Sequence, residues 1–150
     1  MGLAHLSALR SKDPNTQVGA CIVDEDKKVV SIGYNGMPRG CNDEDMPWKR
    51  EGGFKDTKYA YVVHAELNAI LNSPRNLKNT TLYVSLFPCN ECAKAIIQAG
   101  IRKIYYESDK YDGTDGNTVS KAMLDRAGVV YEQLPFSVEL SIRRIDGKKD

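Results

Sequence analysis

The sequence predicts an α/β sandwich in which helices flank a mixed sheet. From residue 80 onward, short β-rich runs alternate with helical segments, a pattern typical of strands joined by crossover helices. Near the start, two further β-rich runs are separated only by a short polar turn, which predicts an antiparallel hairpin. The 150 residues are 41% hydrophobic, enough for a core and too short for two domains, so we expect a single domain over residues 1–150.

The first half of the chain begins with a helical stripe of apolar residues formed by Leu3, Ala4, Leu6, Ala8 and Leu9. This short helix is expected to stop at Asp13-Pro14, because proline disfavours helix at the residue before it. The hairpin strands are predicted at residues 18–23 and 29–32. From residue 33 to 61 nothing is periodic, and a loop of this length is uncommon in a compact domain unless it is functional.

The second half starts with a helix that is predicted to run from near His64 to Leu71 and to end before Ser73-Pro74. The remaining elements are expected in the order strand 80–87, helix 93–99, strand 101–106, polar loop 109–117, helix 119–127 and strand 129–134. Gly100 is expected to end the helix at 93–99, and Gly128 is expected to end the helix at 119–127. The last residues, 146–150, are expected to be frayed.

Charge and composition narrow the classes of partner. The 21 basic residues nearly balance the 20 acidic ones, and the sequence has no block of like charge that would indicate a polyanion-binding surface. We therefore expect no nucleic-acid partner. No apolar run approaches the roughly 18 residues that span a bilayer, and the first residues lack a signal pattern. We therefore expect a soluble, cytoplasmic protein without a membrane partner. In a reducing compartment, C-x-x-C more often indicates metal or redox chemistry than a disulfide.

Two half-motifs carry the chemistry: His64 and Glu66 in the pattern H-x-E, and Cys89 and Cys92 in the pattern P-C-x-x-C. The cysteine spacing places both sulfurs on one face of a first helical turn, where the helix dipole favours thiolate. With neutral His64 as the third ligand, the set predicts a Zn²⁺ site whose fourth position is open to water. Zinc lowers the pKa of such a water towards neutrality, and Glu66 is predicted to move protons as the catalytic acid and base.

Each of these residues also has a structural interpretation. Alone, His64 would be a structural histidine near the start of an apolar helix, and Glu66 a first-turn carboxylate that complements the helix dipole. P-C-x-x-C between a strand and a helix is also the place of a thioredoxin-like redox pair. A closed structural zinc site would need a fourth ligand from His5, Cys21 or Cys41. Of these, Cys21 lies in an apolar strand and is expected to be a small core residue.

The chain is similar to the deoxycytidylate (dCMP) deaminases of the cytidine deaminase superfamily. H-x-E with P-C-x-x-C indicates only the superfamily, a signature of zinc deaminases acting on nucleobases. The blocks that extend the resemblance are residues 10–15 (RSKDPN), 18–20 (VGA), 33–38 (GYNGMP), 64–70 (HAELNAI), 87–93 (FPCNECA) and 108–111 (SDKY). The resemblance covers nearly the whole chain.

This resemblance implies a cytidine-deaminase-like three-layer sandwich with a mixed five-stranded sheet. It implies hydrolysis of dCMP to dUMP and ammonia, which feeds thymidylate synthesis. It also implies a homohexamer that is activated by dCTP and inhibited by dTTP, each bound with Mg²⁺ at a second site. Members of the family have about a further turn of chain before the first helix, so that helix is expected to be shortened here.

The resemblance further implies that Asn35 hydrogen-bonds the deoxyribose, that the backbone of Ala65 binds the base carbonyl, and that Tyr111 lies against the base or sugar. The alternatives are a turn residue for Asn35 and a half-buried loop aromatic for Tyr111. For the 5′-phosphate, which needs a cation or oriented amides, Arg10 and Lys12 are the candidates. Their alternative is a solvated helix C-terminus, where cations are favoured in any case.

The turn-rich loop from residue 33 to 40 is the predicted effector site, through Gly33, Tyr34, Gly36 and Arg39, because glycines let backbone amides approach a triphosphate. An ordinary surface turn is the alternative. Two other functions remain open: a non-catalytic zinc module on a deaminase fold, and a deaminase of a free nucleoside or of a base in a nucleic acid. The first would show lost ligands or a missing glutamate, and the second a basic stripe with exposed aromatics.

Overall fold

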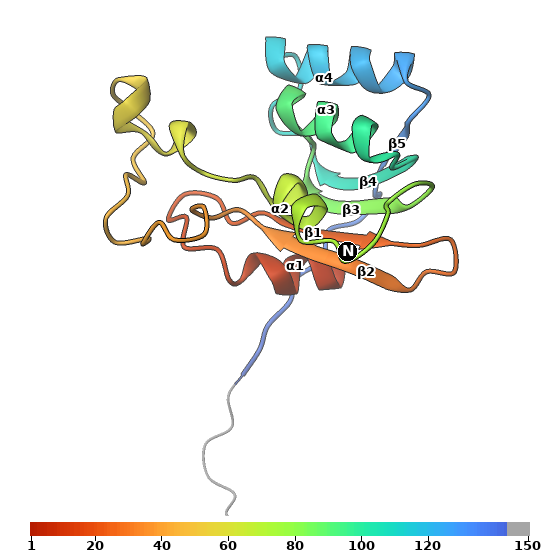
Figure 1. The fold of residues 1–150 in the computed structure, drawn as a ribbon, viewed down its shortest axis with the longest axis horizontal. Helices are drawn as coiled ribbons and strands as arrows, with labels where there is room; N and C mark the ends of the chain where they lie inside the picture. The colour runs from red at the N-terminus through yellow and green to blue at the C-terminus, as the bar shows by residue number, and fades with distance from the viewer. Residues whose placement is uncertain (144–150) are drawn as a thin grey trace, which may run out of the picture.

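A computed structural model describes residues 1–143 and shows a five-stranded sheet between two layers of helices (Figure 1). The strands are β1 (Gly19–Val23), β2 (Val29–Tyr34), β3 (Thr81–Leu86), β4 (Lys103–Ser108) and β5 (Val130–Gln133). The helices are α1 (Gly2–Ala8), α2 (Ala65–Leu71), α3 (Asn90–Ala99) and α4 (Asp115–Arg126), with short 3-10 helices η1 (Phe54–Asp56) and η2 (Lys58–Ala60). The tail at 146–150, expected to fray, lies outside the described residues.

The sheet has the order β2-β1-β3-β4-β5. β1 is antiparallel to both β2 and β3, whereas β3, β4 and β5 run parallel to one another. The parallel strands are joined through α3 and α4, as crossover connections require. The predicted mixed five-stranded α/β sandwich is confirmed.

Helix α1 covers one face of the sheet, opposite the face covered by α2, α3 and α4 (Figure 1). It lies so close to β1 that a Cβ on Gly19 would fall 1.8 Å from the carbonyl oxygen of Ala4. The side of the helix that meets the sheet therefore carries small residues, Ala4, Ser7 and Ala8, all of them buried. The leucines of the predicted apolar stripe, Leu3, Leu6 and Leu9, stay 42–51% exposed on the outer side.

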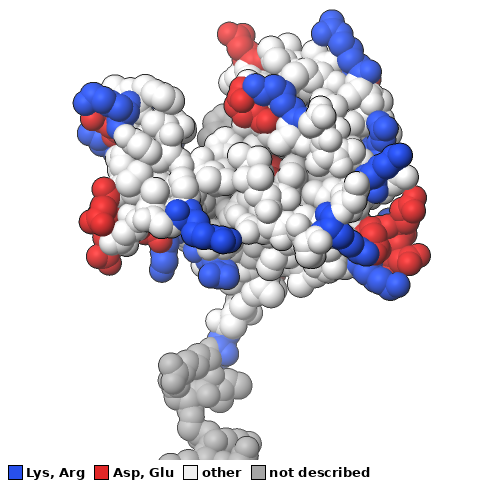
Figure 2. Space-filling model, in the orientation of Figure 1, with Lys and Arg blue, Asp and Glu red and all other residues white. Residues whose placement is uncertain are grey.

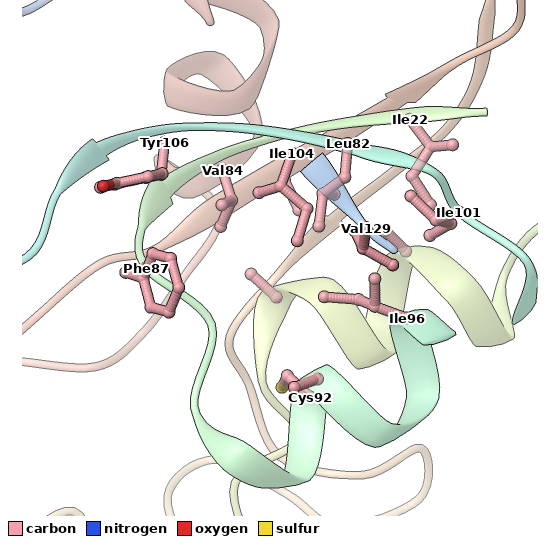
Figure 3. Close-up of a cluster of buried hydrophobic side chains, with 14 of the residues drawn as sticks. Ile22, Leu82, Val84, Phe87, Cys92, Ile96, Ile101, Ile104, Tyr106 and Val129 are labelled. Carbon is pink, nitrogen blue, oxygen red and sulfur yellow. The ribbon is translucent and has the colours of Figure 1, made fainter. Parts of the chain in front are cut away.

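The main core lies between the sheet and the layer that contains α2 and α3. Figure 3 shows Leu82 and Ile104 pointing from the strands towards Ile96 of α3, and Ile22 farther along the same face of the sheet. Each of these four side chains is fully buried. This core fixes the first turns of α2 and α3 relative to the end of β3. One half-motif of the sequence lies at the start of α2, and the other lies at the start of α3.

Two segments differ from the sequence prediction. Helix α4 begins at Asp115, within the predicted polar loop, because the Thr114 hydroxyl oxygen caps it by accepting from the Asn117 N–H (3.4 Å). The long aperiodic segment between β2 and α2 is tied at its base by a β-bridge between Gly36 and Val63 and contains η1 and η2.

The surface carries charges of both signs. Figure 2 shows Lys and Arg side chains interspersed with Asp and Glu over the face in view. Among the described residues, no helix combines the length and the apolar character that crossing a membrane would take.

Candidate active site

Two helix N-termini meet at the site. His64 is the residue that immediately precedes α2, and Cys89 immediately precedes α3, so each occupies the N-cap position of its helix. Cys92 lies in the first turn of α3 and is buried. The fold therefore brings together the three predicted ligands, which are up to 28 residues apart along the chain.

The three ligands have the spacing that zinc requires. His64 Nδ1 lies 3.3 Å from Cys89 Sγ and 3.5 Å from Cys92 Sγ. For tetrahedral zinc, bond lengths of about 2.0–2.1 Å to nitrogen and 2.3 Å to sulfur imply a nitrogen–sulfur separation of about 3.5 Å. Across residues 1–143, this is the one group of His, Cys, Asp and Glu side chains found close enough to hold a metal ion. The residues present thus fit a zinc ion with a fourth position for another ligand.

None of the alternative fourth ligands joins this group. The His5 side chain pairs with Glu107, Cys21 is buried in β1, and Cys41 is exposed. Because His64 contacts both sulfurs through the same nitrogen, the site also differs from a simple dithiol redox pair, in which the histidine would have no part.

The two thiols are electrostatically unequal. Hydrogen bonds from Cys92 and from His64 lower the pKa of Cys89 to about 4, although burial opposes this. The same hydrogen bond to Cys89, together with burial, raises the pKa of Cys92. The hydrogen bond with Cys89 raises the pKa of His64. A thiolate at Cys89 is therefore available to a cation at this position.

Glu66 lies beside the ligands without being one of them. Its side chain is buried, with the residue only 4% exposed, and burial raises its pKa to about 7. A carboxyl group with a pKa near neutrality can both accept and return a proton at physiological pH, which is the property a general acid and base requires.

A cavity of about 270 Å³ opens onto these residues. Its volume is near the lower end of the range of about 300–1,000 Å³ typical of small-molecule sites. The predicted substrate residues Asn35, Ala65 and Tyr111 all line it. The full lining is Asp13, Thr16, Val18, Asn35, Arg50, Lys58, Tyr59, Val62, His64, Ala65, Glu66, Leu86, Phe87, Cys89 and Tyr111.

Asn35 is buried and held by three hydrogen bonds. Its Nδ2 donates to Asp13 Oδ2 (3.2 Å) and to the carbonyl oxygen of Thr16 (2.9 Å), and its Oδ1 accepts from the Val18 N–H (2.8 Å). Both amide hydrogens are thus used within the protein, and only one lone pair of Oδ1 is left for a ligand. Asn35 directly follows β2, and its side chain belongs to a buried hydrogen-bond network.

An ion pair between Asp13 and Lys58 forms part of the cavity wall, and sequence reasoning missed it. The Lys58 ammonium group donates to Asp13 Oδ2, and the two side chains are only 10% and 1% exposed. The other oxygen, Oδ1, accepts from the backbone N–H groups of Asn15 (2.8 Å) and Thr16 (3.3 Å). The two charged residues are 45 positions apart in the chain, and no local sequence pattern predicts that they are in contact.

Arg10 and Lys12, the residues predicted to bind the substrate phosphate, do not line this cavity. Ser11 and Asp13 are buried, and the Ser11 hydroxyl donates to the carbonyl oxygen of Asn35 (2.8 Å). Arg10 and Lys12, which alternate in the sequence with these two buried residues, are exposed. They line a second hollow of about 510 Å³, together with the effector-loop residues Tyr34, Gly36 and Arg39.

Gly33 does not line the second hollow. It belongs to β2, and a Cβ there would fall 2.2 Å from the carbonyl oxygen of Ala65 and 2.4 Å from the backbone nitrogen of Ala69. The close approach of α2 to the sheet therefore explains why this position is a glycine.

The comparisons with known proteins agree with this geometry. A family model described as the cytidine and deoxycytidylate deaminase zinc-binding region matches residues 1–108. The chain belongs to the cytidine and deoxycytidylate deaminase family. All three candidate ligands and Glu66 lie within the matched residues, and the resemblance noted in the sequence is confirmed.

Relatives within this family are similar over most of the chain. The deoxycytidylate deaminase of Homo sapiens is 56% identical over 135 residues, which cover 89% of this chain and 76% of the relative. A probable deoxycytidylate deaminase of Drosophila melanogaster is 54% identical over 140 residues, which cover 89% of this chain and 69% of the relative. The structure of a dCMP deaminase from cyanophage S-TIM5 in complex with dCMP and dUMP has a TM-score of 0.69 at 28% identity, covering 88% of this chain and 91% of that one.

Proposed function

We propose that this protein hydrolyses dCMP to dUMP and ammonia with the help of a zinc ion, and so supplies dUMP for thymidylate synthesis in the cytoplasm. The observation that carries the proposal is the cluster of His64, Cys89 and Cys92 beside buried Glu66, in a cavity of about 270 Å³. The cluster occurs in a chain that is 56% identical to a human deoxycytidylate deaminase.

The protein residues divide the work of the reaction. A zinc ion on His64, Cys89 and Cys92 would lower the pKa of a bound water towards neutrality. Glu66, whose pKa burial raises to about 7, would carry two protons of the attacking water in turn, the first to the pyrimidine ring nitrogen and the second to the amino group that leaves as ammonia. Because Ala65 is the first residue of α2, its N–H has no acceptor within the helix and is available to the base carbonyl.

The sugar is proposed to lie between the metal ligands and the cavity mouth. Asn35 offers one remaining lone pair on Oδ1, so it would accept a hydrogen bond from a deoxyribose hydroxyl rather than donate one. The Tyr111 side chain, 44% exposed at the mouth, would lie against the base or the sugar.

Regulation is proposed to act through the second hollow. The guanidinium of Arg10 lies 5.1 Å from the ring centre of Tyr34, and Lys12 and Arg39 line the same hollow. Three cations in one hollow suit a triphosphate, so we propose that dCTP as activator and dTTP as inhibitor bind there with Mg²⁺. Gly36 supplies backbone that can approach the nucleotide. We further propose that the protein works as a homohexamer.

The proposal is tested by measuring ammonia release from dCMP, CMP, deoxycytidine and a cytosine oligonucleotide, each with and without dCTP. Preferred turnover of dCMP, increased by dCTP, is the expected result. Equal or faster turnover of deoxycytidine would refute the monophosphate assignment, and preferred turnover of the oligonucleotide would favour a nucleic-acid deaminase. A rate on dCMP that does not respond to dCTP would refute the regulatory part alone.

A further inference from the structure

The substrate phosphate needs a cation, and the residues predicted for this role line a different hollow. Two cationic side chains do line the cavity, those of Arg50 and Lys58. The charge of Lys58 is already balanced by its buried ion pair with Asp13. Arg50 is therefore the cation in the cavity lining that has no carboxylate partner among the described ion pairs.

The exposed fractions of the lining residues show which of them lie at the bottom of the cavity and which lie at its mouth. Ala65 and Glu66, beside the metal ligands, are 0% and 4% exposed, and Asn35 is 6% exposed. Tyr59 and Tyr111 are 54% and 44% exposed. If the reacting base lies at the bottom and the sugar at Asn35, the 5′-phosphate reaches the level of the two exposed tyrosines.

Arg50 is held at this level by its surroundings. Its Nε–H donates to the hydroxyl of Tyr59 (3.3 Å). The chain just before it is fixed twice, because the Lys58 N–H donates to the carbonyl oxygen of Lys49 (3.1 Å) and Asn15 Nδ2 donates to that of Trp48 (3.3 Å). The guanidinium nitrogens beyond Nε remain available for a planar, two-pronged contact with a phosphate.

A second cation, Lys110, lies next to this rim on the loop between β4 and α4, and it lines an adjoining hollow that shares Thr16 with the cavity. Lys110 Nζ donates to Thr16 Oγ1 (3.2 Å), and Thr16 lines the cavity. Lys110 Nζ also lies 5.1 Å from the ring centre of the neighbouring Tyr111. Neither contact neutralises the charge of Lys110.

The loop that carries Lys110 is itself fixed by charge. Lys121 Nζ donates to Asp109 Oδ2 (2.8 Å) and to Asp112 Oδ1 (2.7 Å), on either side of Lys110 in the sequence. Asn117 Nδ2 donates to the second oxygen of Asp109 (2.6 Å). The two acidic neighbours of Lys110 are thus paired with Lys121, so Lys110 keeps its charge for a ligand.

We propose that Arg50 and Lys110 bind the 5′-phosphate of the nucleotide, from two different loops that meet at the cavity mouth. Arg50 makes the directional contact, and Lys110 adds charge beside Thr16. The inference rests on the proposed function for the identity of the nucleotide, and it assigns discrimination between nucleotide and nucleoside to these two side chains.

The test compares the binding of dUMP and deoxyuridine, which differ only in the phosphate, by titration calorimetry. Arg50→Gln and Lys110→Gln should each weaken dUMP binding about tenfold, which corresponds to about 1.4 kcal/mol, and should change deoxyuridine binding less than about twofold. Arg126→Gln and Lys28→Gln serve as matched controls, because both side chains are exposed and line neither the cavity nor the adjoining hollow that contains Lys110. In wild type, but less so in the double variant, added salt should weaken dUMP binding.

Kinetics provide the second measurement. Both variants should raise KM for dCMP about tenfold, while kcat/KM for deoxycytidine changes little. The assignment would be overturned if the variants bind dUMP as tightly as wild type does, or if their affinities for dUMP and for deoxyuridine fall equally. This holds even if wild type deaminates dCMP. Failure of wild type to release ammonia from dCMP would instead refute the proposed function.

Discussion

Replacing Asp13 by asparagine tests how the cavity wall is held together. The carboxylate is almost fully buried, and it joins three parts of the chain: the turn at Asn15 and Thr16, the amide of Asn35, and the ammonium of Lys58. An asparagine side chain can still accept from the two backbone N–H groups through its oxygen. It cannot balance the charge of Lys58, whose side chain is only 10% exposed.

The expected cost follows from that uncompensated charge. Removing one partner of a buried ion pair typically costs about 3–5 kcal/mol. With a urea dependence of about 1–3 kcal/mol per molar, the unfolding midpoint should fall by at least about 1 M. Combining Asp13→Asn with Lys58→Met removes both charges and should recover more than half of the loss, since neutral replacements of buried pairs are often tolerated.

The pH dependence has a defined sign. Burial alone would raise the pKa of Asp13, but hydrogen bonds from Lys58, Asn15 and Thr16 outweigh it and hold the pKa below its ordinary value of 3.8. The stabilisation is therefore present above about pH 4 and is lost as the pH falls below it, so the gap between wild type and Asp13→Asn should narrow in acid.

Urea unfolding of the wild type and variants, followed by circular dichroism, measures this effect. Asp26→Asn is the matched control, because Asp26 and its partner Lys28 are 76% and 74% exposed and should contribute less than about 1 kcal/mol. A change below about 1 kcal/mol for Asp13→Asn, or a gap that widens in acid, would refute the reasoning.

Three further changes test other parts of the structure. Gly33→Ala should destabilise the protein by at least about 1–3 kcal/mol in thermal unfolding, because its Cβ would meet the backbone of α2, whereas Gly2→Ala, with nothing within 4 Å, should change stability by less than about 0.5 kcal/mol. Arg39→Gln should raise the dCTP concentration for half-activation about tenfold without changing the basal rate, and an unchanged dCTP response would contradict the effector site. Cys89→Ser should lose zinc by elemental analysis, and retained zinc would exclude Cys89 as a ligand.

The candidate metal-binding group could be predicted from the sequence because its residues occupy short, rigid contexts. His64 and Cys89 each directly precede a helix, and the spacing of Cys89 and Cys92 fixes their relative position on α3. The strands of the sheet are similarly predictable, since each is a compact β-rich run bounded by turn residues.

The cavity wall and the proposed phosphate site depend on contacts between distant parts of the chain, which local patterns do not reveal. Lys58 lies in an aperiodic segment, and the sequence pattern around its partner Asp13 indicates only the end of a helix. Arg10 and Lys12 have the right charge for a phosphate, but the burial of Ser11 turns both outward. The outward-facing leucines of α1 show the same limit, because close packing at Gly19 selected small residues for the inner face.

The measurement that tests the central claim most directly is zinc content together with dCMP deamination in Glu66→Gln. The account predicts about one zinc per chain, as in wild type, because His64, Cys89 and Cys92 supply all three protein ligands. It predicts that ammonia release from dCMP falls by about 10²- to 10⁴-fold, because Asp13, the other carboxyl residue in the cavity lining, is held in an ion pair with Lys58. Loss of zinc in this variant would make Glu66 a ligand, and near wild-type activity would remove it from the mechanism.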